Sequence, residues 1–321
     1  MRAWIATFLA LVLTACAASP QSVAQDNSMP VTAAKRIAFT FDDTPRHAGA
    51  FFTEDERTRL MIKALRDGGA RQGAFFINPG KIPERPGAEA RIAAYIEAGH
   101  VIANHTFSHP RLSRTETGEY IADIDQASQW LSGREGTRAW FRYPYLDEGR
   151  NDKSKRDAVR DALKARGLIN ASPTVDASDW WIDSALGKAE REGKAYDQAA
   201  AGRVFVEVHV EAAEFYNALA LETYDRPIVH NILLHETDLS ALFLGDLIAA
   251  LKEAGWTIVT ADEAFADPVY KGAPDVPSAQ GTLVELAAWH KGIGSQRWYP
   301  GNDTKLLEKR FNEQVLGKDE Q

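Results

Sequence analysis

The sequence predicts an α/β fold built on a parallel sheet. Short runs rich in β-branched and aromatic residues alternate with amphipathic helical segments between about Lys35 and Thr260, a pattern typical of parallel strands joined by helices. The chain has 321 residues, 45% of them hydrophobic, which is enough for one large α/β domain or two ordinary ones. Polar side chains follow several predicted strands, so they should gather at one end of the sheet.

The first predicted unit is strand, helix, strand. RIAFTF at 36–41 is a short β-rich run, and the stretch 69–77 contains another. Between them, 55–69 carries apolar residues such as Leu60 and Leu65 and ends in two glycines, as a helix would. Further helix and strand pairs are expected at 88–100 with 100–105, 120–133 with 138–144, and 157–168 with 169–176.

The second half of the chain continues this alternation. Segment 202–224 begins with a Val-rich run that would suit a strand, but Val204, Val208 and Phe215 fit a helical stripe, so a helix is expected. The next expected elements are a strand within 227–238, a helix at 239–255 and a last strand at 256–260. Beyond Pro268, proline and glycine punctuate an extension with helical segments at 282–290 and 303–316.

The N-terminus predicts export. Arg2 precedes an apolar stretch that is too short to span a membrane, and LTAC follows at 13–16. LTAC resembles the lipobox of bacterial lipoproteins, so 1–16 is interpreted as a lipoprotein signal with Cys16 as the acylated residue. Ordinary cleavage at a small-residue site is the alternative. Residues 17–34 have the composition of a flexible tether, and both interpretations place the mature protein in the bacterial cell envelope, facing the periplasm or exterior.

Charge and cysteine content exclude several classes of protein. The formal net charge is −8, and no long stripe of lysine and arginine offsets it, so nucleic acid is not an expected partner. Cys16 is the single cysteine, which excludes an intrachain disulfide and a cysteine-rich metal site.

The polar residues at the predicted strand ends form a candidate site. They are Asp42 and Asp43, His105 and His109, Arg142, Asp176 and Asp179, and His235. His105 and His109 are four residues apart in a turn closed by Pro110, a spacing that can present both rings to one metal ion. With Asp43 they would form a set of two histidines and one carboxylate that leaves coordination positions open.

Structural interpretations compete with each of these. Asp42 and Asp43 could cap a helix, Arg142 could lie on the surface, His235 could be a satisfied buried histidine, and Trp180 could belong to the core. Glu207, His209 and Glu211 could form a second metal site if 202–224 were a strand, but a solvated face is the preferred interpretation. His47, His100, His209 and His230 are interpreted as ordinary structural histidines.

Five short motifs resemble, in order, those of the polysaccharide deacetylases with a NodB homology domain, also called carbohydrate esterase family 4. The motifs are TFDD (40–43), HTFSH (105–109), RYPY (142–145), DASDW (176–180) and LLH (233–235). The resemblance implies a distorted (β/α) barrel over 35–268, with 269–321 as a C-terminal extension packed on it. It also implies an enzyme that removes acetyl groups from N-acetylated or O-acetylated sugars and uses one divalent metal ion. Zn²⁺ is the expected ion, and Co²⁺ and Mn²⁺ are the alternatives.

The resemblance also implies a role for each matching residue. Asp42 would be the catalytic base and His235 the general acid, while Asp43, His105 and His109 would hold the metal. Arg142 would orient Asp42 and be braced by Asp179. The backbone N–H of Tyr145 would help bind the oxyanion, and Trp180 would wall the acetyl pocket.

The chain departs from the family pattern in three places, one of which is the long, charge-rich stretch 181–226. Thr44-Pro45 follows the first motif where Gly-Pro is common, and RYPY continues into LDEG, expected to be an acidic loop at the mouth of the site. These departures affect the prediction of the substrate more than the prediction of the chemistry. The alternatives are therefore a deacylase of another small acyl compound and, from a different class, a catalytically silent carbohydrate-binding lipoprotein.

Overall fold

The computed structural model describes residues 34–294 and 296–317, so the predictions for the signal segment, for Cys16 and for nearly all of the tether lie outside the described residues. Seven strands form the main sheet: β1 (Lys35–Thr44), β2 (Ala74–Ile77), β3 (Val101–Asn104), β4 (Thr137–Phe141), β6 (Ile169–Asn170), β7 (Val229–His235) and β8 (Trp256–Ile258). Two short strands, β5 (Asp147–Arg150) and β9 (Ala279–Gln280), pair separately.

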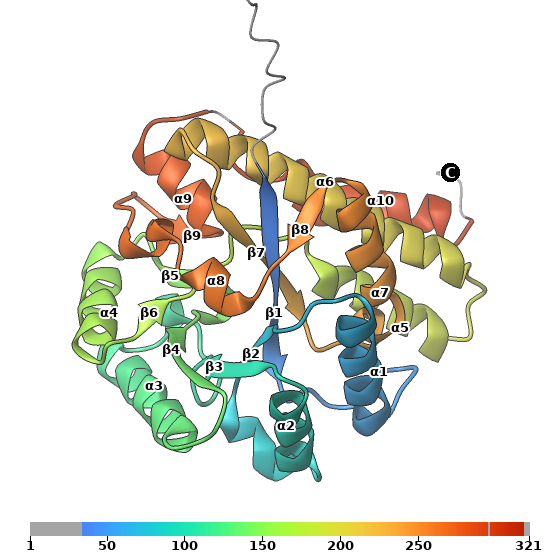
Figure 1. Ribbon diagram of the computed structural model, residues 1–321, viewed down its shortest axis with the longest axis horizontal. Coiled ribbons are helices and arrows are strands. Elements are labelled where there is room, and N and C mark those ends of the chain that lie inside the picture. The colour runs from blue at the N-terminus through green and yellow to red at the C-terminus, as the bar shows by residue number, and fades with distance from the viewer. Residues whose placement is uncertain (1–33, 295, 318–321) are drawn as a thin grey trace, which may run out of the picture. The chain divides into compact units, whose positions relative to one another are not determined.

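The main sheet is parallel throughout and runs in the order β6-β4-β3-β2-β1-β7 (Figure 1). β8 pairs with the first residues of β1, on the edge that β2 occupies further along. β1 therefore lies in the interior of the sheet, which agrees with the unbroken burial of its residues 37–42. The predicted α/β fold, a distorted (β/α) barrel, is confirmed, with the parallel sheet curled as such a barrel requires.

Segment 169–176, which begins with β6, connects β4 to the opposite edge strand, β7. At its start, the Ala171 N–H donates to the Phe141 carbonyl of β4 at 2.7 Å. At its end, the Val175 N–H donates to the Asn231 carbonyl of β7 at 3.1 Å, and Val175 accepts from Leu233 at 2.9 Å. The result is an irregular ring of strands. The strand predicted over 169–176 is only two residues long, because Pro173 has no N–H to continue a ladder.

Helices cover the sheet. The α-helices are α1 (Glu54–Asp67), α2 (Ala88–Glu97), α3 (Thr117–Leu131), α4 (Lys153–Ala165), α5 (Asp179–Arg191), α6 (Gln198–Tyr224), α7 (Asp238–Glu253), α8 (Ala261–Phe265), α9 (Leu283–His290) and α10 (Thr304–Gln314). The 3₁₀ turns are η1 (Pro79–Glu84), η2 (Leu112–Arg114), η3 (Pro144–Leu146), η4 (Pro268–Lys271) and η5 (Pro300–Asn302). None of the helices within these described residues is long and apolar enough to cross a membrane.

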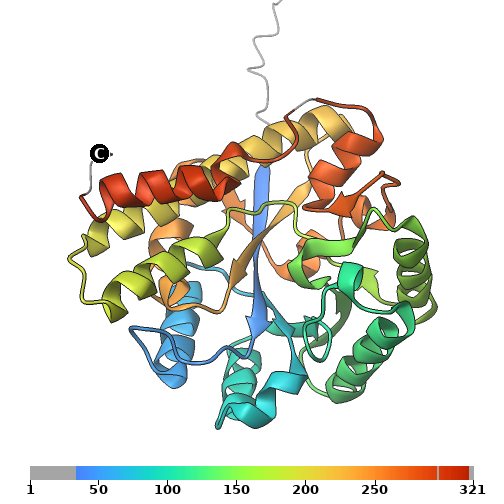
Figure 2. The same cartoon turned by 180° about the vertical axis from the view of Figure 1, so that it is seen from behind.

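The helices predicted from apolar periodicity are present, including α6 across the Val-rich segment. Helix α5 was not predicted; it begins directly at Asp179 of the fourth motif. The C-terminal helices α9 and α10 pack on α6, and α10 runs along it in the view from behind (Figure 2). Phe311 of α10 is buried and meets the ring of Trp181 on α5 edge to face.

The prediction of an acidic loop at the mouth of the site is wrong. The residues concerned form β5, and Asp147 and Glu148 are both buried. Asp147 accepts a hydrogen bond from the Ser113 hydroxyl at 2.5 Å, and Glu148 pairs with Arg160 at 2.7 Å. Hydrogen bonds satisfy Asp147 and an ion pair compensates Glu148 within the fold, which the local sequence could not reveal.

Candidate active site

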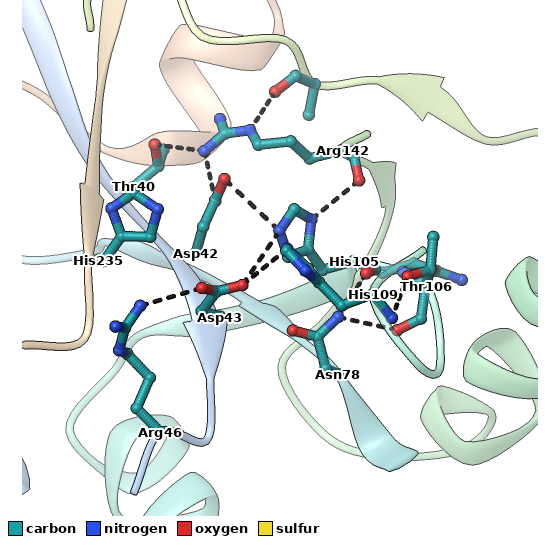
Figure 3. A network of polar contacts seen from close by, with 12 residues as sticks. Thr40, Asp42, Asp43, Arg46, Asn78, His105, Thr106, His109, Arg142 and His235 are labelled. Atoms are coloured by element: carbon teal, nitrogen blue, oxygen red, sulfur yellow. Dashed lines mark hydrogen bonds and ion pairs between the residues drawn. The ribbon is translucent and has the colours of Figure 1, made fainter. Parts of the chain in front are cut away.

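The adjacent carboxylates at the end of β1 diverge. Asp42 is still in register with His235 of β7 and is buried. Asp43 has φ +68°, a left-handed backbone conformation that turns its side chain away from that of Asp42. Figure 3 shows the outcome: Asp42 contacts Arg142, whereas Asp43 faces the two histidines of the second motif. The cap interpretation does not hold, because Thr53 caps the following helix.

Asp43, His105 and His109 form a group that could hold a metal ion. One ligand atom from each lies within 4.8 Å of the others. His109 Nε2 is 2.8 Å from Asp43 Oδ1, and His105 Nε2 is 3.7 Å from the same oxygen. The Nδ1 atom of His105 is 2.9 Å from the Arg142 carbonyl, so a proton on Nδ1 leaves the Nε2 lone pair directed into the group.

The protonation states of two of these residues suit a cation. Burial holds the pKa of His105 well below its ordinary value, so the imidazole is neutral and can donate a lone pair. Burial alone would raise the pKa of Asp43, but its hydrogen bond to His109 and the charges of His109 and Lys81 hold it well below the ordinary value. Two imidazoles and one ionised carboxylate fit a divalent cation such as Zn²⁺.

Asp123 of α3 fixes the loop that carries the two histidines. Its carboxylate accepts from the backbone N–H groups of Phe107 at 2.7 Å and Ser108 at 3.0 Å, and from the Ser108 hydroxyl at 2.6 Å. Thr106 and His109 both have φ +64°, and the Thr106 hydroxyl accepts from the His109 N–H at 3.0 Å. Such backbone strain persists only when the surroundings enforce it, so Asp123 acts on the metal group through this loop.

Two cations that sequence reasoning missed also reach Asp43. The Arg46 guanidinium is 3.0 Å from Oδ2, and the Lys81 ammonium is 3.4 Å from Oδ1. Arg46 lies three residues after Asp43, so its proximity could have been suspected. Lys81 comes from η1, and only the folded arrangement brings it there.

Arg142 is fully buried and holds Asp42. Its guanidinium donates to Asp42 Oδ1 and to the Thr40 hydroxyl, both at 2.8 Å, and to Asn231 Oδ1 at 2.9 Å. The predicted brace from Asp179 is wrong. Asn231 of β7 takes that position, and its own amide donates to the Ser172 carbonyl and the Tyr270 hydroxyl. Burial raises the pKa of Asp42, and Arg142 opposes that shift.

Asp179 pairs with His235 instead. Asp179 Oδ1 is 2.7 Å from His235 Nδ1, and Oδ2 accepts the His235 backbone N–H at 2.7 Å. Burial would lower the pKa of His235, but the Asp179 carboxylate outweighs burial and raises it to about 9. His235 is therefore protonated at neutral pH, with Nδ1 bonded to Asp179 and Nε2 available to other groups.

These groups line one cavity of about 450 Å³. Its walls are Asp42, Asp43, Arg46, His105, His109, Arg111, Tyr145, Leu146, Asp176, Trp180, Leu233, His235 and Gln280. Tyr145 and Trp180 are 45% and 46% exposed, and the Tyr145 ring lies 4.6 Å from that of His109. Burial raises the pKa of Asp176 to about 6. Arg142 and Asp179 lie behind this wall and act through Asp42 and His235.

The second metal site considered from the sequence does not form. Glu207 and Glu211 lie on helix α6 and both pair with Arg310 of α10. His209 is buried on another face of the helix, with Nδ1 2.6 Å from the Phe205 carbonyl. In the part of the chain that the structure describes, the group formed by Asp43, His105 and His109 is the one found with metal-binding geometry.

Comparison with curated proteins reveals several relatives. The peptidoglycan-N-acetylglucosamine deacetylase PgdA of Listeria monocytogenes is 26% identical over 239 residues, 74% of this chain and 40% of that protein. Chitin deacetylase 1 of Saccharomyces cerevisiae is 30% identical over 152 residues, 47% of this chain and 42% of that protein. The chain thus spans only about two-fifths of the length of these relatives.

Solved structures also resemble this chain. A family 4 carbohydrate esterase from Streptomyces lividans in complex with acetate has a TM-score of 0.48 at 19% identity, covering 75% of this chain and 98% of its own. The chitin deacetylase of Colletotrichum lindemuthianum has a TM-score of 0.49 at 19% identity, covering 74% and 89%.

The family comparison covers the first part of the site. Residues 30–166 match the family described as polysaccharide deacetylase. This range holds Asp42, the three members of the metal-binding group and Arg142, and it ends before Asp179 and His235. Over residues 30–166 the chain therefore matches the polysaccharide deacetylase family, and the metal-binding group lies within this matched range.

Proposed function

We propose that this protein is a metal-dependent hydrolase that removes acetyl groups from N-acetylated sugars of cell-envelope glycans, with O-acetyl groups as the alternative target. One observation carries the proposal. A carboxylate, Asp42, and a protonated imidazole, His235, line the same cavity as the metal-binding group, and each is held by its own buried partner. The activities of the peptidoglycan and chitin deacetylases among its relatives support the choice of glycan.

The metal-binding group suits Zn²⁺, with Co²⁺ or Mn²⁺ as substitutes, because it combines two imidazoles with one carboxylate. When bound, such a cation polarises an acyl carbonyl and lowers the pKa of a water molecule. His105 and His109 would hold it through Nε2, and Asp43 through a carboxylate oxygen.

Asp42 would act as the general base. Arg142 occupies Oδ1, so Oδ2 is the oxygen that can accept a proton from the attacking water. Oδ2 lies 3.8 Å from Nε2 of His105, on the side of the metal-binding group. Burial raises the pKa of Asp42, and the positive charge of Arg142 opposes that shift because it favours the carboxylate form.

His235 would act as the general acid. Asp179 keeps Nδ1 protonated, so Nε2 carries the second proton, which can pass to the departing sugar amine. Tyr145 and Trp180 flank the cavity and would contribute a backbone N–H to the oxyanion and a wall to the acetyl group, respectively.

The test is acetate release from chitin oligomers, peptidoglycan glycan strands and acetylxylan by the purified protein. We expect release from at least one N-acetylated glycan, loss of activity after chelation, and recovery on adding Zn²⁺, Co²⁺ or Mn²⁺. Full turnover by protein shown to be metal-free by elemental analysis would contradict metal dependence. Glycan binding without acetate release would favour the silent carbohydrate-binding alternative.

We also propose that the protein is exported and anchored by acylation of Cys16. This rests on the LTAC sequence and on the tether-like composition of 17–34. The anchor would keep residues 35–268 and the extension 269–321 at the membrane surface, close to envelope glycans.

A further inference from the structure

Arg111 and Tyr145 form a stacked pair on the cavity wall. The Arg111 guanidinium carbon lies 3.5 Å from the centroid of the Tyr145 ring, and both residues line the cavity. Stacking fixes the plane of the guanidinium but occupies only its face, so its N–H edge can still donate hydrogen bonds. A planar fork of donors matches a carboxylate better than it matches a single hydroxyl.

Arg111 lacks the partner that other arginines of the site have. Arg142 is paired with Asp42, and Arg46 is paired with Asp43. Within residues 34–294 and 296–317, no carboxylate forms an ion pair with Arg111, although its side chain is partly buried. A partly desolvated cation without a counter-ion gains more from an anionic ligand than a fully hydrated one does.

A second cation lines the same cavity. Arg46 contacts Asp43, with Lys81 on the other oxygen of that carboxylate. Asp43 also belongs to the metal-binding group, so its single negative charge would be shared among Arg46, Lys81 and a divalent ion. Loading with metal therefore adds positive charge where Arg46 already faces the cavity.

Few acids in the cavity oppose this charge. Asp42 is neutralised by Arg142, which leaves Asp176 as the one lining carboxylate without a basic partner among the described residues. The buried acids of β5 face Ser113 and Arg160 rather than the cavity. In a chain with a net charge of −8, a cavity with two arginines concentrates positive potential at the substrate.

We propose that the cavity selects acetylated glycans that carry a carboxylate close to the acetylated sugar, and that Arg111 binds this carboxylate. The inference rests on the proposed deacetylase function and narrows its substrate class. Two kinds of glycan offer this chemistry: those with a lactyl ether on an amino sugar and those with a uronic acid.

The kinetic test uses matched oligosaccharides, each with its carboxylate intact or reduced to the alcohol. Metal-loaded wild type should prefer the intact member of at least one pair, and which pair it prefers identifies the lactyl or uronic source. Arg111→Gln should lower the ratio of kcat/KM for intact over reduced substrate by about 10- to 100-fold, the size of a hydrogen-bonded ion pair, mainly through KM. Arg111→Lys should recover only part of this, because it keeps the charge but not the fork.

Arg114→Gln is the matched control. Arg114 lies three residues further along the same loop, is exposed and does not line the cavity. The Arg114→Gln substitution removes the same charge as Arg111→Gln, so a general effect of net charge would change the substrate preference of both variants alike. An equal preference for intact and reduced substrates, or the same loss for Arg111→Gln and Arg114→Gln, would overturn the proposal.

Binding to metal-loaded Asp42→Asn protein separates this proposal from the deacetylase function. Calorimetry with the intact and reduced glycans should show tighter binding of the intact form. The double variant that also carries Arg111→Gln should bind both forms equally. If no glycan releases acetate from wild type yet this preference persists, the function is wrong and the carboxylate site stands. Acetate release with no carboxylate preference in either assay would leave the function standing and reject the carboxylate site.

Discussion

The pair formed by Asp179 and His235 gives a quantitative prediction. In the folded protein, Asp179 holds the pKa of His235 at about 9, against an ordinary value of 6.5. At 1.36 kcal/mol per pH unit, this gap corresponds to about 3 kcal/mol in favour of the protonated imidazole. Asp179→Asn preserves the shape and removes the charge. Burial then acts against protonation, and the pKa of His235 should fall by on the order of 2 pH units.

The contribution of the Asp179–His235 pair to stability depends on pH. Because the folded pKa of His235 lies above the unfolded one, the interaction stabilises the fold fully below pH 6.5. The stabilisation is lost as the pH rises through about 9. Wild type should therefore lose stability between pH 6.5 and 9 relative to Asp179→Asn.

The assay is NMR titration of the His235 ring in metal-free protein, combined with thermal melts across the same pH range. Asp183→Asn is the control, because Asp183 is another poorly accessible carboxylate of α5 that accepts a backbone N–H, from Leu239, without touching His235. A His235 pKa that stays near 9 in Asp179→Asn, or that falls equally in Asp183→Asn, would refute the reasoning.

Three further predictions follow from the site and the N-terminus. Asn231→Leu removes the acceptor for one arm of the buried Arg142, so kcat should fall with little change in KM. The free energy of unfolding should fall by on the order of 1–3 kcal/mol, seen as a lower melting temperature. Wild-type kinetics in this variant would show that Asn231 does not position Arg142. Asp123→Asn should weaken metal binding about 10- to 100-fold by calorimetry, since it loosens the loop of His109, and an unchanged Kd would contradict this role. Cys16→Ser should move the protein from the membrane fraction to the soluble fraction with full activity, and a wild-type protein without an acyl chain by mass spectrometry would reject the anchor.

The sequence predicted the parts of the fold and site that depend on local pattern. Apolar periodicity was sufficient for the helices such as α6, and β-rich runs were sufficient for the central strands. The family resemblance gave Asp42 and Asp43 different roles, and the structure separates their side chains through the left-handed backbone conformation of Asp43.

The partners of buried charges could not be predicted in the same way. Asp179 was expected to face Arg142 but bonds to His235, because the start of α5 lies beside the end of β7. Asn231 resembles any polar residue within a strand, yet its amide satisfies Arg142. Lys81 and Arg111 are ordinary surface residues in the sequence, and only tertiary packing brings them to the cavity and its metal-binding group.

The most direct test of the central claim compares Asp42→Asn with Asp43→Asn. For each variant, metal content, melting temperature and kcat for acetate release would be measured with and without excess Zn²⁺. Asp42→Asn should keep its metal and lose about 10²- to 10⁴-fold in kcat. Asp43→Asn should bind metal weakly and regain part of its activity in excess metal. A fully active, metal-replete Asp42→Asn protein would contradict the assignment of Asp42 as the base.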